Sequence, residues 1–284
     1  MLEGQTDPRA RRTRSAPSPA ALRRQYRLEK QLAERLRCAS PGERPSLYGE
    51  VYDELFARVK PHLETDERGA SARIQAQLRL MWPYLGPGRD FLEVGAGDGA
   101  LTKAVAPHVG TAYALEVSRE IAAHLDADPS VELLVPRGGE IPLADDSIDF
   151  AYSYQVVEHL HPDDARAQFR ELSRVLRPGG AFLCITPNRL SGPHDISRHF
   201  DREATGLHLC EYTLGELSEA LREAGFATVS AQRTVRGRAV TIPAAPIAAF
   251  ERALGRLPWR ARARIARSDL VDRALDIYAL ARMP

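Results

Sequence analysis

A glycine-rich turn and a downstream acid are the residues of this chain whose types and spacing best suit chemistry. Gly95–Gly99 reads Gly-Ala-Gly-Asp-Gly and follows the apolar run Phe91–Val94, and Glu116 ends the next apolar run. Glycines remove side chains where a bound ligand must approach the backbone. In an open α/β sheet, an acid at the end of the following strand can hold a ribose by its hydroxyls. The pattern therefore predicts a site for a cofactor that contains a nucleoside.

Three later segments extend this pattern. Ile141–Phe150 carries acids ahead of an apolar strand, Gln155–Leu160 follows that strand, and Arg174–Gly180 ends in a Pro-Gly-Gly turn before another apolar run. Together with Glu93–Gly99, in this order and spacing, they resemble the motifs of class I S-adenosylmethionine-dependent methyltransferases over roughly residues 70–235. The resemblance implies an α/β fold with a doubly wound, mostly parallel sheet of the seven-stranded, Rossmann-like type. It also implies S-adenosyl-L-methionine (SAM) as the cofactor and methyl transfer as the reaction.

The resemblance assigns contacts with SAM to particular positions. Glu116 stands where the family holds the ribose hydroxyls, whereas Glu93 either contacts the methionine part of SAM or only orders the glycine turn. The family often places an acid against the adenine amine. Here that stretch is Val135–Glu140, so either Glu140 or the backbone near Arg137 would take this role. We expect SAM to contact Glu93, Gly95, Ala96, Gly97, Glu116, Val117, Arg137, Gly138, Ser153, Tyr154, Gln155 and His159.

Residues 187–212 form a long irregular stretch that holds three of the eight histidines. A connection of this length is uncommon in a compact domain unless it is functional, so we expect it to bind the acceptor. His194 with Asp195, or His199 with Asp201, could be a base and its orienting acid, although a single histidine more often holds such a loop together. The expected acceptor-binding residues are Asn188, Arg189, His194, Arg198, His208 and Tyr212, and the expected catalytic residues are His194 and His199.

No metal site is expected. A set of His194, His199 and His208 would offer three imidazoles, but their spacing matches no standard ligand pattern. His159 is as suited to a structural use as to a cofactor contact. Methyl transfer from a sulfonium requires mainly the alignment of nucleophile, methyl group and sulfur, and a base only where the nucleophile must lose a proton.

The absence of one sequence motif narrows the range of possible acceptors. Methyltransferases that act on adenine in nucleic acid, or on glutamine in proteins, usually carry an Asn/Asp-Pro-Pro-aromatic tetrad where this chain has Ser153–Val156. This favours a small-molecule acceptor, such as a biosynthetic intermediate, with oxygen preferred to carbon or nitrogen as the methylated atom. Two alternatives stay open. Gly95, Gly97 and Ala100, with Glu116 about 20 residues on, fit the loose fingerprint of an NAD(P)-dependent oxidoreductase. The other alternative is a non-catalytic SAM-binding subunit that kept the fold, although the intact glycine turn and Glu116 argue against it.

Apolar spacing predicts the elements that position these residues, with strands and helices in the alternation typical of a parallel sheet. The expected strands are 91–94, 112–116, 131–135, 148–153, 181–186 and 227–235. The expected helices are 20–38, 47–59, 70–82, 100–105, 119–126, 214–224 and one capped by Asp163 or Asp164 that stops before Pro178. Residues 274–282 are a strand or a helix, because their periodicity does not decide.

Three regions follow from these elements. Residues 1–19 are expected to be a disordered basic tail, because they are rich in proline, serine and arginine and poor in large apolar side chains. Residues 20–82 are expected to be a helical lid or flank. Residues 83–284 are expected to be the methyltransferase domain, with the substrate insert at 187–212 and a helical insert at about 243–274.

Composition is ordinary for a globular protein, with 44% hydrophobic and 27% charged residues among 284 and a net charge of +1. A near-neutral chain gives no electrostatic argument for nucleic acid or membrane partners. No apolar run approaches the roughly 20 residues that span a bilayer. Cys38, Cys184 and Cys210 are typical of reduced cytosolic thiols, and the N-terminus shows no secretion signal. We expect a cytoplasmic protein, and the sequence leaves its oligomeric state open, a homodimer included.

Overall fold

The fold is built on one mixed β-sheet. The computed structural model describes residues 18–59, 67–118, 125, 129–136, 139–235 and 238–284. Within these residues the sheet has eight strands in the order β3-β2-β1-β4-β5-β8-β6-β7. They are β1 (Asp90–Val94), β2 (Thr111–Leu115), β3 (Glu132–Leu134), β4 (Ile148–Tyr154), β5 (Leu176–Thr186), β6 (Thr228–Val235), β7 (Arg238–Pro243) and β8 (Ile277–Arg282).

The first five strands are parallel and doubly wound. β1 pairs in parallel with β2 and β4, β2 pairs with β3, and β4 pairs with β5. The chain runs outward from β1 to β3 and then returns to β4 beside β1, so the strand order reverses between β1 and β4. Ligands of such sheets bind outside the carboxyl ends of the strands at this switch point. β8 is antiparallel to β5 and β6, and β7 is an edge strand beyond the expected seven-stranded type. The predicted α/β fold class is confirmed.

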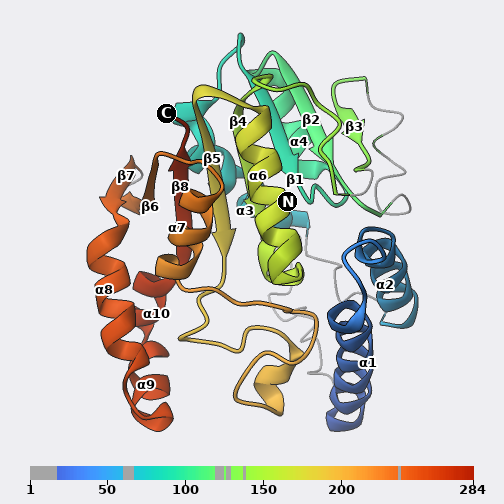
Figure 1. Ribbon diagram of the computed structural model, residues 1–284, viewed down its shortest axis with the longest axis vertical. Helices are drawn as coiled ribbons and strands as arrows, with labels where there is room; N and C mark the ends of the chain where they lie inside the picture. Colours follow the sequence, from blue (N-terminus) through green and yellow to red (C-terminus); the bar gives the residue numbers. More distant parts are fainter. Residues whose placement is uncertain (1–17, 60–66, 119–124, 126–128, 137–138, 236–237) are drawn as a thin grey trace, which may run out of the picture.

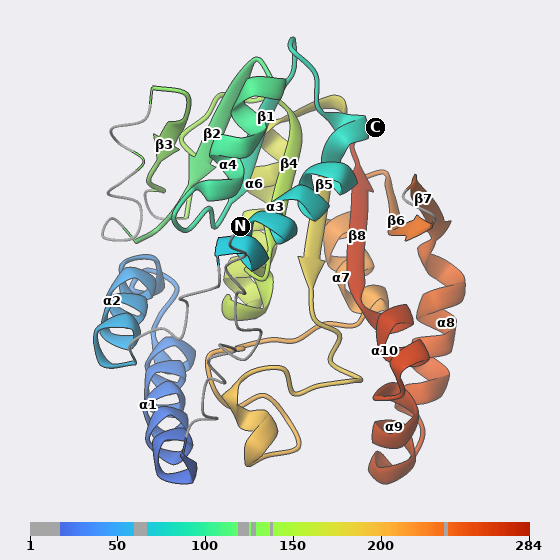
Figure 2. The same ribbon diagram turned by 180° about the vertical axis from the view of Figure 1, so that it is seen from behind.

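Helices cover both faces of the sheet (Figure 1 and Figure 2). One face carries α6 (Pro162–Val175) and α7 (Leu214–Glu223), and the other carries α3 (Glu67–Met81) and α4 (Ala100–Val105). Phe169 of α6 packs 6.4 Å from Phe182 of β5, between ring centroids. On the opposite face Tyr84 stacks on Phe150 of β4 at 4.8 Å. Burial on both faces explains why these strands are continuous apolar runs in the sequence.

Two N-terminal helices, α1 (Pro19–Cys38) and α2 (Arg44–Arg58), lie beyond the carboxyl ends of the strands (Figure 1). The side chain of Ser18 caps α1 by accepting a hydrogen bond from the Ala21 amide. Leu32 and Leu36 of α1 pack against Val51 of α2 and Leu207 of the 187–212 insert. The two helices are therefore joined to the insert by a small apolar core of their own.

A polar anchor also fixes α2 to the start of α6. Arg44 is only 3% exposed and donates to both carboxylate oxygens of Asp164, at 2.7 and 3.0 Å. The Tyr48 hydroxyl donates to Asp164 at 2.7 Å and accepts from the His161 amide at 2.8 Å. Because a buried guanidinium is tolerated only with such partners, this anchor fixes the position of α2 against α6.

Three helices fill the region between β7 and β8, where the helical insert was expected. They are α8 (Ala244–Gly255), α9 (Trp259–Ala266) and α10 (Asp269–Leu275). Pro258 lies between α8 and α9 and is the N-cap of α9. None of the helices in the described part of the chain is both long and apolar enough to cross a membrane.

Some local predictions need correction. The N-cap of α6 is His161, whose ring accepts a hydrogen bond from the Asp163 amide, and neither Asp163 nor Asp164 takes that place. β5 begins at Leu176, so the Pro-Gly-Gly segment lies inside the strand as an irregularity in its pairing with β4. Gly179 makes this possible because it adopts φ of +73°.

Further differences concern β7 and β8, and some predictions fall outside the described residues. β7 was not predicted, and residues 277–282 are a strand because they pair with both β5 and β6. Residues 1–17 and most of the expected helix 119–126 lie outside the described residues. The division into a lid and a methyltransferase domain stays a prediction.

Candidate functional site

The glycine turn connects β1 to α4 at the carboxyl edge of the sheet. Gly95 and Gly99 have φ of +71° and +69°. A Cβ atom would lie 2.5 Å from Val156 at the first and 2.0 Å from Leu125 at the second. At Gly97 a Cβ atom would meet nothing within 4 Å, so this glycine leaves open space in the turn. The backbone is thus shaped by two glycines that packing requires and one that keeps the surface clear.

Glu116 faces this turn from the end of β2. Its carboxylate is 8% exposed and accepts hydrogen bonds from the Gly97 amide at 2.9 Å and from the Val117 and Ser118 amides at 2.8 and 3.0 Å. A carboxylate offers about four acceptor positions, so the fixed group retains capacity for a further donor. Ala96 is buried and Val117 is 40% exposed beside this acid. The geometry suits a ligand that donates hydroxyl hydrogens.

Glu93 is buried beneath the same turn. Its carboxyl group accepts a hydrogen bond from the Thr102 hydroxyl in the first turn of α4. Burial raises the pKa of Glu93 to about 8, so the neutral form predominates at pH 7. This contact is with α4 and not with the amides of the glycine turn, so both expected roles of Glu93 stay predictions.

The residues at the end of β4 differ in how far they are exposed. Ser153 is fully buried and its hydroxyl pairs with Cys184 at 3.6 Å, so the structure does not support the expected side-chain contact with a cofactor. Tyr154 is 39% exposed, and Gln155 adopts φ of +56° while its amide donates to the Ile185 carbonyl at 2.9 Å. These two residues end the strand at the edge where ligands bind. The predicted adenine contacts, Arg137 and Gly138, lie outside the described residues.

A cavity of about 520 Å³ lies between α1, α2 and the insert. Its polar lining comes from Gln25, Glu29, Tyr52, His159, His194, Asp195, Arg198, His199 and His208. Burial, together with the negative charges of nearby groups that include Glu158 and Glu116, raises the pKa of Tyr52. The Ser118 hydroxyl donates to Asp53 at 3.0 Å, which joins α2 to the loop after β2. The helix that supplies Tyr52 to the cavity is therefore bonded to the loop that follows Glu116.

The insert uses several expected acceptor residues for its own structure. Asn188 is 1% exposed, and its amide donates to Glu251 at 2.6 Å and to the Leu275 carbonyl at 3.0 Å. Tyr212 is buried in the main core beside it. The structure thus places Asn188 and Tyr212 away from the 520 Å³ cavity, because they tie the insert to α8 and the sheet. Of the other four, Arg198, His194 and His208 line the cavity, and Arg189 does not.

The expected histidine–aspartate pairs do not form. Asp195 accepts from the Ser197 and Gly206 amides at 2.9 and 2.8 Å, and Asp201 accepts from the Tyr26 and Thr205 hydroxyls at 2.5 Å. Both acids therefore hold the loop. The Nε2 atom of His194 lies 3.0 Å from the Asn188 carbonyl oxygen. The Ser191 hydroxyl lies 3.1 Å from the same Nε2 atom. Because a carbonyl only accepts, the tautomer with its hydrogen on Nε2 satisfies the Asn188 contact and leaves a lone pair on Nδ1.

His199 differs from His194 in its surroundings. It is exposed, and its Nε2 atom accepts from Arg198 Nε at 3.2 Å. Glu211, which the sequence analysis did not single out, organises the other histidines. It accepts from the His194 amide and from His208 Nδ1, both at 2.7 Å. His194 and His208 are therefore the positioned histidines of the insert.

Glu158, His159 and His208 form a cluster that the sequence analysis did not bring together. One ligand atom from each lies within 4.8 Å of the others, and the two rings meet edge to face at 4.8 Å. Burial raises the pKa of Glu158 to about 7 and lowers that of His159 to about 3. Although burial opposes it, the bond to Glu211 and the charge of Glu158 raise the pKa of His208. His208 is distant in sequence, so spacing offered no signal.

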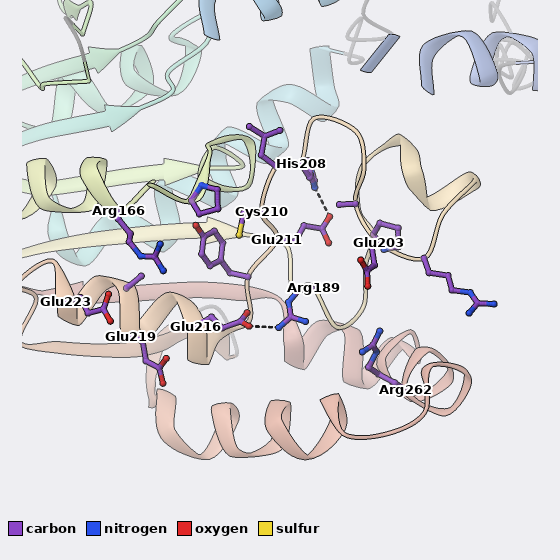
Figure 3. Close-up of a pocket in the computed structure, with 17 residues that line it drawn as sticks. Arg166, Arg189, Glu203, His208, Cys210, Glu211, Glu216, Glu219, Glu223 and Arg262 are labelled. Atoms are coloured by element: carbon purple, nitrogen blue, oxygen red, sulfur yellow. Dashed lines mark hydrogen bonds and ion pairs between the residues drawn. The ribbon is translucent and has the colours of Figure 1, made fainter. Parts of the chain in front are cut away.

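A second cavity, of about 560 Å³, lies on another side of the insert (Figure 3). Its lining comes from α6, α7, α9 and the insert and alternates basic with acidic side chains, among them Arg166, Arg189, Arg262, Glu203, Glu216 and Glu219. His208 and Glu211 stand at its wall, and Arg189 is paired with Glu216 (Figure 3). No residue of α1 or α2 lines this cavity, in contrast to the 520 Å³ cavity, and the glycine turn lines neither of the two.

Comparison with known proteins agrees with this geometry. Residues 92–184 match a family model described as a methyltransferase domain. Proteins named probable S-adenosylmethionine-dependent methyltransferases are similar: one from Mycolicibacterium smegmatis is 38% identical over 141 residues, covering 49% of this chain and 52% of its own. Another, from Mycobacterium tuberculosis, is 35% identical over 143 residues, covering 50% of each chain. The chain spans about half the length of these curated relatives.

A solved structure extends the similarity to the fold as a whole. The crystal structure of the [4+2]-cyclase SpnF has a TM-score of 0.53 and 22% sequence identity, and the match covers 84% of this chain and 97% of that one. At this identity the likeness concerns the fold alone. A fold shared with a cyclase shows that the architecture does not by itself determine the reaction.

Proposed function

We propose that this protein transfers a methyl group from SAM to an oxygen atom of a small-molecule acceptor, because residues 92–184 match a methyltransferase-domain model and similar proteins are named probable S-adenosylmethionine-dependent methyltransferases. The proposal rests on where the glycine turn, Glu116 and the cavity lie in the fold. The glycine turn and Glu116 stand at the switch point of the sheet, and α2, which lines a polar cavity of about 520 Å³, is bonded to the loop after Glu116. SAM is the cofactor of this domain class, and the carboxylate of Glu116 beside the glycine turn suits its ribose.

The cofactor would be held by the β1 and β2 ends of the sheet. The ribose hydroxyls donate to Glu116, whose carboxylate three backbone amides fix in place. The clear surface at Gly97 admits the cofactor to the backbone. Tyr154 and Gln155 at the end of β4 face the methionine side. Nicotinamide binding draws support only from the loose glycine fingerprint, and the family match favours SAM.

Transfer would take place where the crevice meets the cavity. The acceptor oxygen forms a bond to the methyl carbon as the carbon–sulfur bond breaks, which leaves S-adenosylhomocysteine. The hydroxyl proton passes to a base, and His194 Nδ1 is the group with a free lone pair in a fixed ring. The lid of α1 and α2 and the insert exclude water from this space.

The cavity supports a small polar acceptor, such as a biosynthetic intermediate. Glu29, Asp195 and Arg198 offer charged groups of both signs, and the remaining polar lining is imidazole, phenol and amide. The net charge of +1 gives no support to a nucleic acid substrate. The three described cysteines are free thiols, which supports a reducing, cytoplasmic location.

A calorimetric titration with S-adenosylhomocysteine, NADH and NADPH in parallel tests the proposal. We expect micromolar binding of S-adenosylhomocysteine alone. A panel of hydroxylated acceptors is then incubated with SAM, and release of S-adenosylhomocysteine is measured. Binding of a nicotinamide cofactor instead would overturn the cofactor assignment. Binding of S-adenosylhomocysteine without turnover on any acceptor would favour a non-catalytic SAM-binding subunit.

A further inference from the structure

The cluster of Glu158, His159 and His208 is held by the backbone of two segments. Glu158 and His159 lie in the short turn Val157–His159 after β4, and His208 comes from the insert. The Cys210 amide donates to the Glu158 carbonyl at 3.1 Å, and His159 Nδ1 lies 3.1 Å from the Leu207 carbonyl oxygen. Two hydrogen bonds thus clamp the segments together and set the two imidazoles face to edge.

Both imidazoles are oriented as metal-binding histidines are. His159 Nδ1 donates to the Leu207 carbonyl, and His208 Nδ1 bonds to the Glu211 carboxylate at 2.7 Å. In metal sites the second ring nitrogen of a ligating histidine is held by a carbonyl or a carboxylate in this way. In the neutral form of each ring, the Nε2 atom keeps a lone pair for another partner.

Glu158 completes the set with an oxygen that lacks a partner. The residue is fully buried, and its Oε2 atom accepts from the Thr186 hydroxyl at 2.8 Å. Its Oε1 atom is buried with no hydrogen bond among the described residues. An unsatisfied buried polar atom is costly and calls for a ligand, an ion or a proton.

We infer that Glu158, His159 and His208 bind one divalent transition-metal ion at the wall of the acceptor cavity. Two imidazoles and one carboxylate suit Zn²⁺, Fe²⁺, Co²⁺ or Mn²⁺ better than Mg²⁺ or Ca²⁺, which prefer all-oxygen sets. The three ligand atoms lie within 4.8 Å of one another. Ligand atoms of a tetrahedral site with bonds near 2.0–2.1 Å are about 3.4 Å apart, so small side-chain rotations would close the set on the ion.

The ion would have an open position toward the acceptor. His159 and His208 both line the 520 Å³ cavity, and three protein ligands leave at least one coordination site free. Resting on the proposed function, the free site binds the acceptor through an oxygen atom. The acceptor class is then a molecule whose hydroxyl or enolic oxygen can coordinate a metal.

Metal binding is tested on the full chain without SAM or acceptor. The chelator-treated protein is titrated with Zn²⁺, Co²⁺ and Mg²⁺, and bound metal is counted by elemental analysis. We expect one Zn²⁺ or Co²⁺ per chain, with Mg²⁺ bound far more weakly. The Co²⁺ complex should show visible bands for nitrogen and oxygen ligands and no thiolate charge-transfer band, which separates this site from the exposed Cys38.

Substitutions at the proposed metal-binding residues test which side chains hold the ion. Glu158→Gln, which keeps the shape of the side chain, and His208→Ala should each weaken metal binding at least about tenfold. His108→Ala is the matched control, because that imidazole packs against Trp82 outside the cluster. Absence of stoichiometric binding, or equal affinity of wild type and Glu158→Gln, would overturn the inference. The S-adenosylhomocysteine titration of the same variants reports the proposed function separately, and its affinity should be unchanged.

Discussion

The cofactor side and the acceptor side of this molecule are built in opposite ways. Gly95–Gly99, Thr102 and Glu116 lie close along the chain, and hydrogen bonds accepted by the Glu93 and Glu116 carboxyl groups hold them within one β-α-β unit. The 520 Å³ cavity instead gathers residues from α1, α2, the end of β4 and the insert. A site made of local backbone geometry tolerates changes in the lid, whereas a site made by docking depends on every contact between distant segments. The predictions below separate the two sides.

The largest expected effect is on turnover when the acceptor side is changed. His194→Ala should lower kcat by about 10²-fold or more, because a positioned general base contributes 10²–10⁴-fold. The affinity for S-adenosylhomocysteine should stay within about twofold, measured by calorimetry. His199→Ala is the comparison variant, since that ring is exposed and bonded only to Arg198. A larger loss with His199→Ala would transfer the role of base to His199.

Glu116→Ala should have the converse effect on the cofactor side. Loss of a hydrogen bond from a ribose hydroxyl to a charged acceptor, about 1.5–3 kcal/mol, should weaken S-adenosylhomocysteine binding about 10- to 100-fold. Glu132→Ala is the matched control, because Glu132 is an exposed acid at the start of the neighbouring strand. Unchanged affinity in Glu116→Ala would remove the ribose assignment.

Arg44→Ala should loosen the lid and leave the glycine turn intact. The variant strands Asp164, whose side chain is 21% exposed, so water compensates in part and we expect a loss of about 2 kcal/mol in lid docking. Faster amide hydrogen exchange in α1 and α2 than in β1 and α4 would report this. Arg58→Ala is the control, since its exposed pair with Glu54 contributes little. Equal loosening of both regions would show that lid and sheet unfold as one unit.

The last expected effect is a pH dependence of stability that belongs to Glu93. Burial raises its pKa to about 8, above the 4.5 of an unperturbed glutamate, so the folded state binds more protons than the unfolded state between these values. Stability should therefore fall as pH rises through this window, by up to about 1.4 kcal/mol per pH unit from this group. Glu93→Gln should flatten that slope in denaturant titrations at pH 5 to 9. An identical slope in wild type and variant would contradict the assignment.

Much of the fold was predictable because its strongest signals are local. The strands from β1 to β5 are short apolar runs between glycine, proline and acidic punctuation, so their places followed from the pattern. The edge strand β7 was not predictable, because it has no core face that an alternation would reveal. It exists through its pairing with β6. The cap of α6 was misassigned since an imidazole at His161 took the role usual for an aspartate.

The candidate site shows the same division at the level of single residues. Asn188 and Ser153 have polar side chains at the right edge of the sheet, and the sequence could not reveal that both turn inward to bond with Glu251 and Cys184. Glu211 escaped notice because its role is to hold two histidines that touch the cavity. Direction of a side chain is a property of packing, which spacing does not encode.

The sequence by itself determined the α/β fold class, the glycine turn and the acid that faces it, because a strand, a turn and a helix start are set by residues adjacent along the chain. Only the tertiary structure decided that Glu158 and His159 meet His208, and that α1 and α2 enclose the cavity with the insert. Those meetings depend on the Arg44–Asp164 anchor, the Leu207 contacts and the clamp at Cys210. Each is a long-range contact, whose free energy exists only once the distant segments have docked.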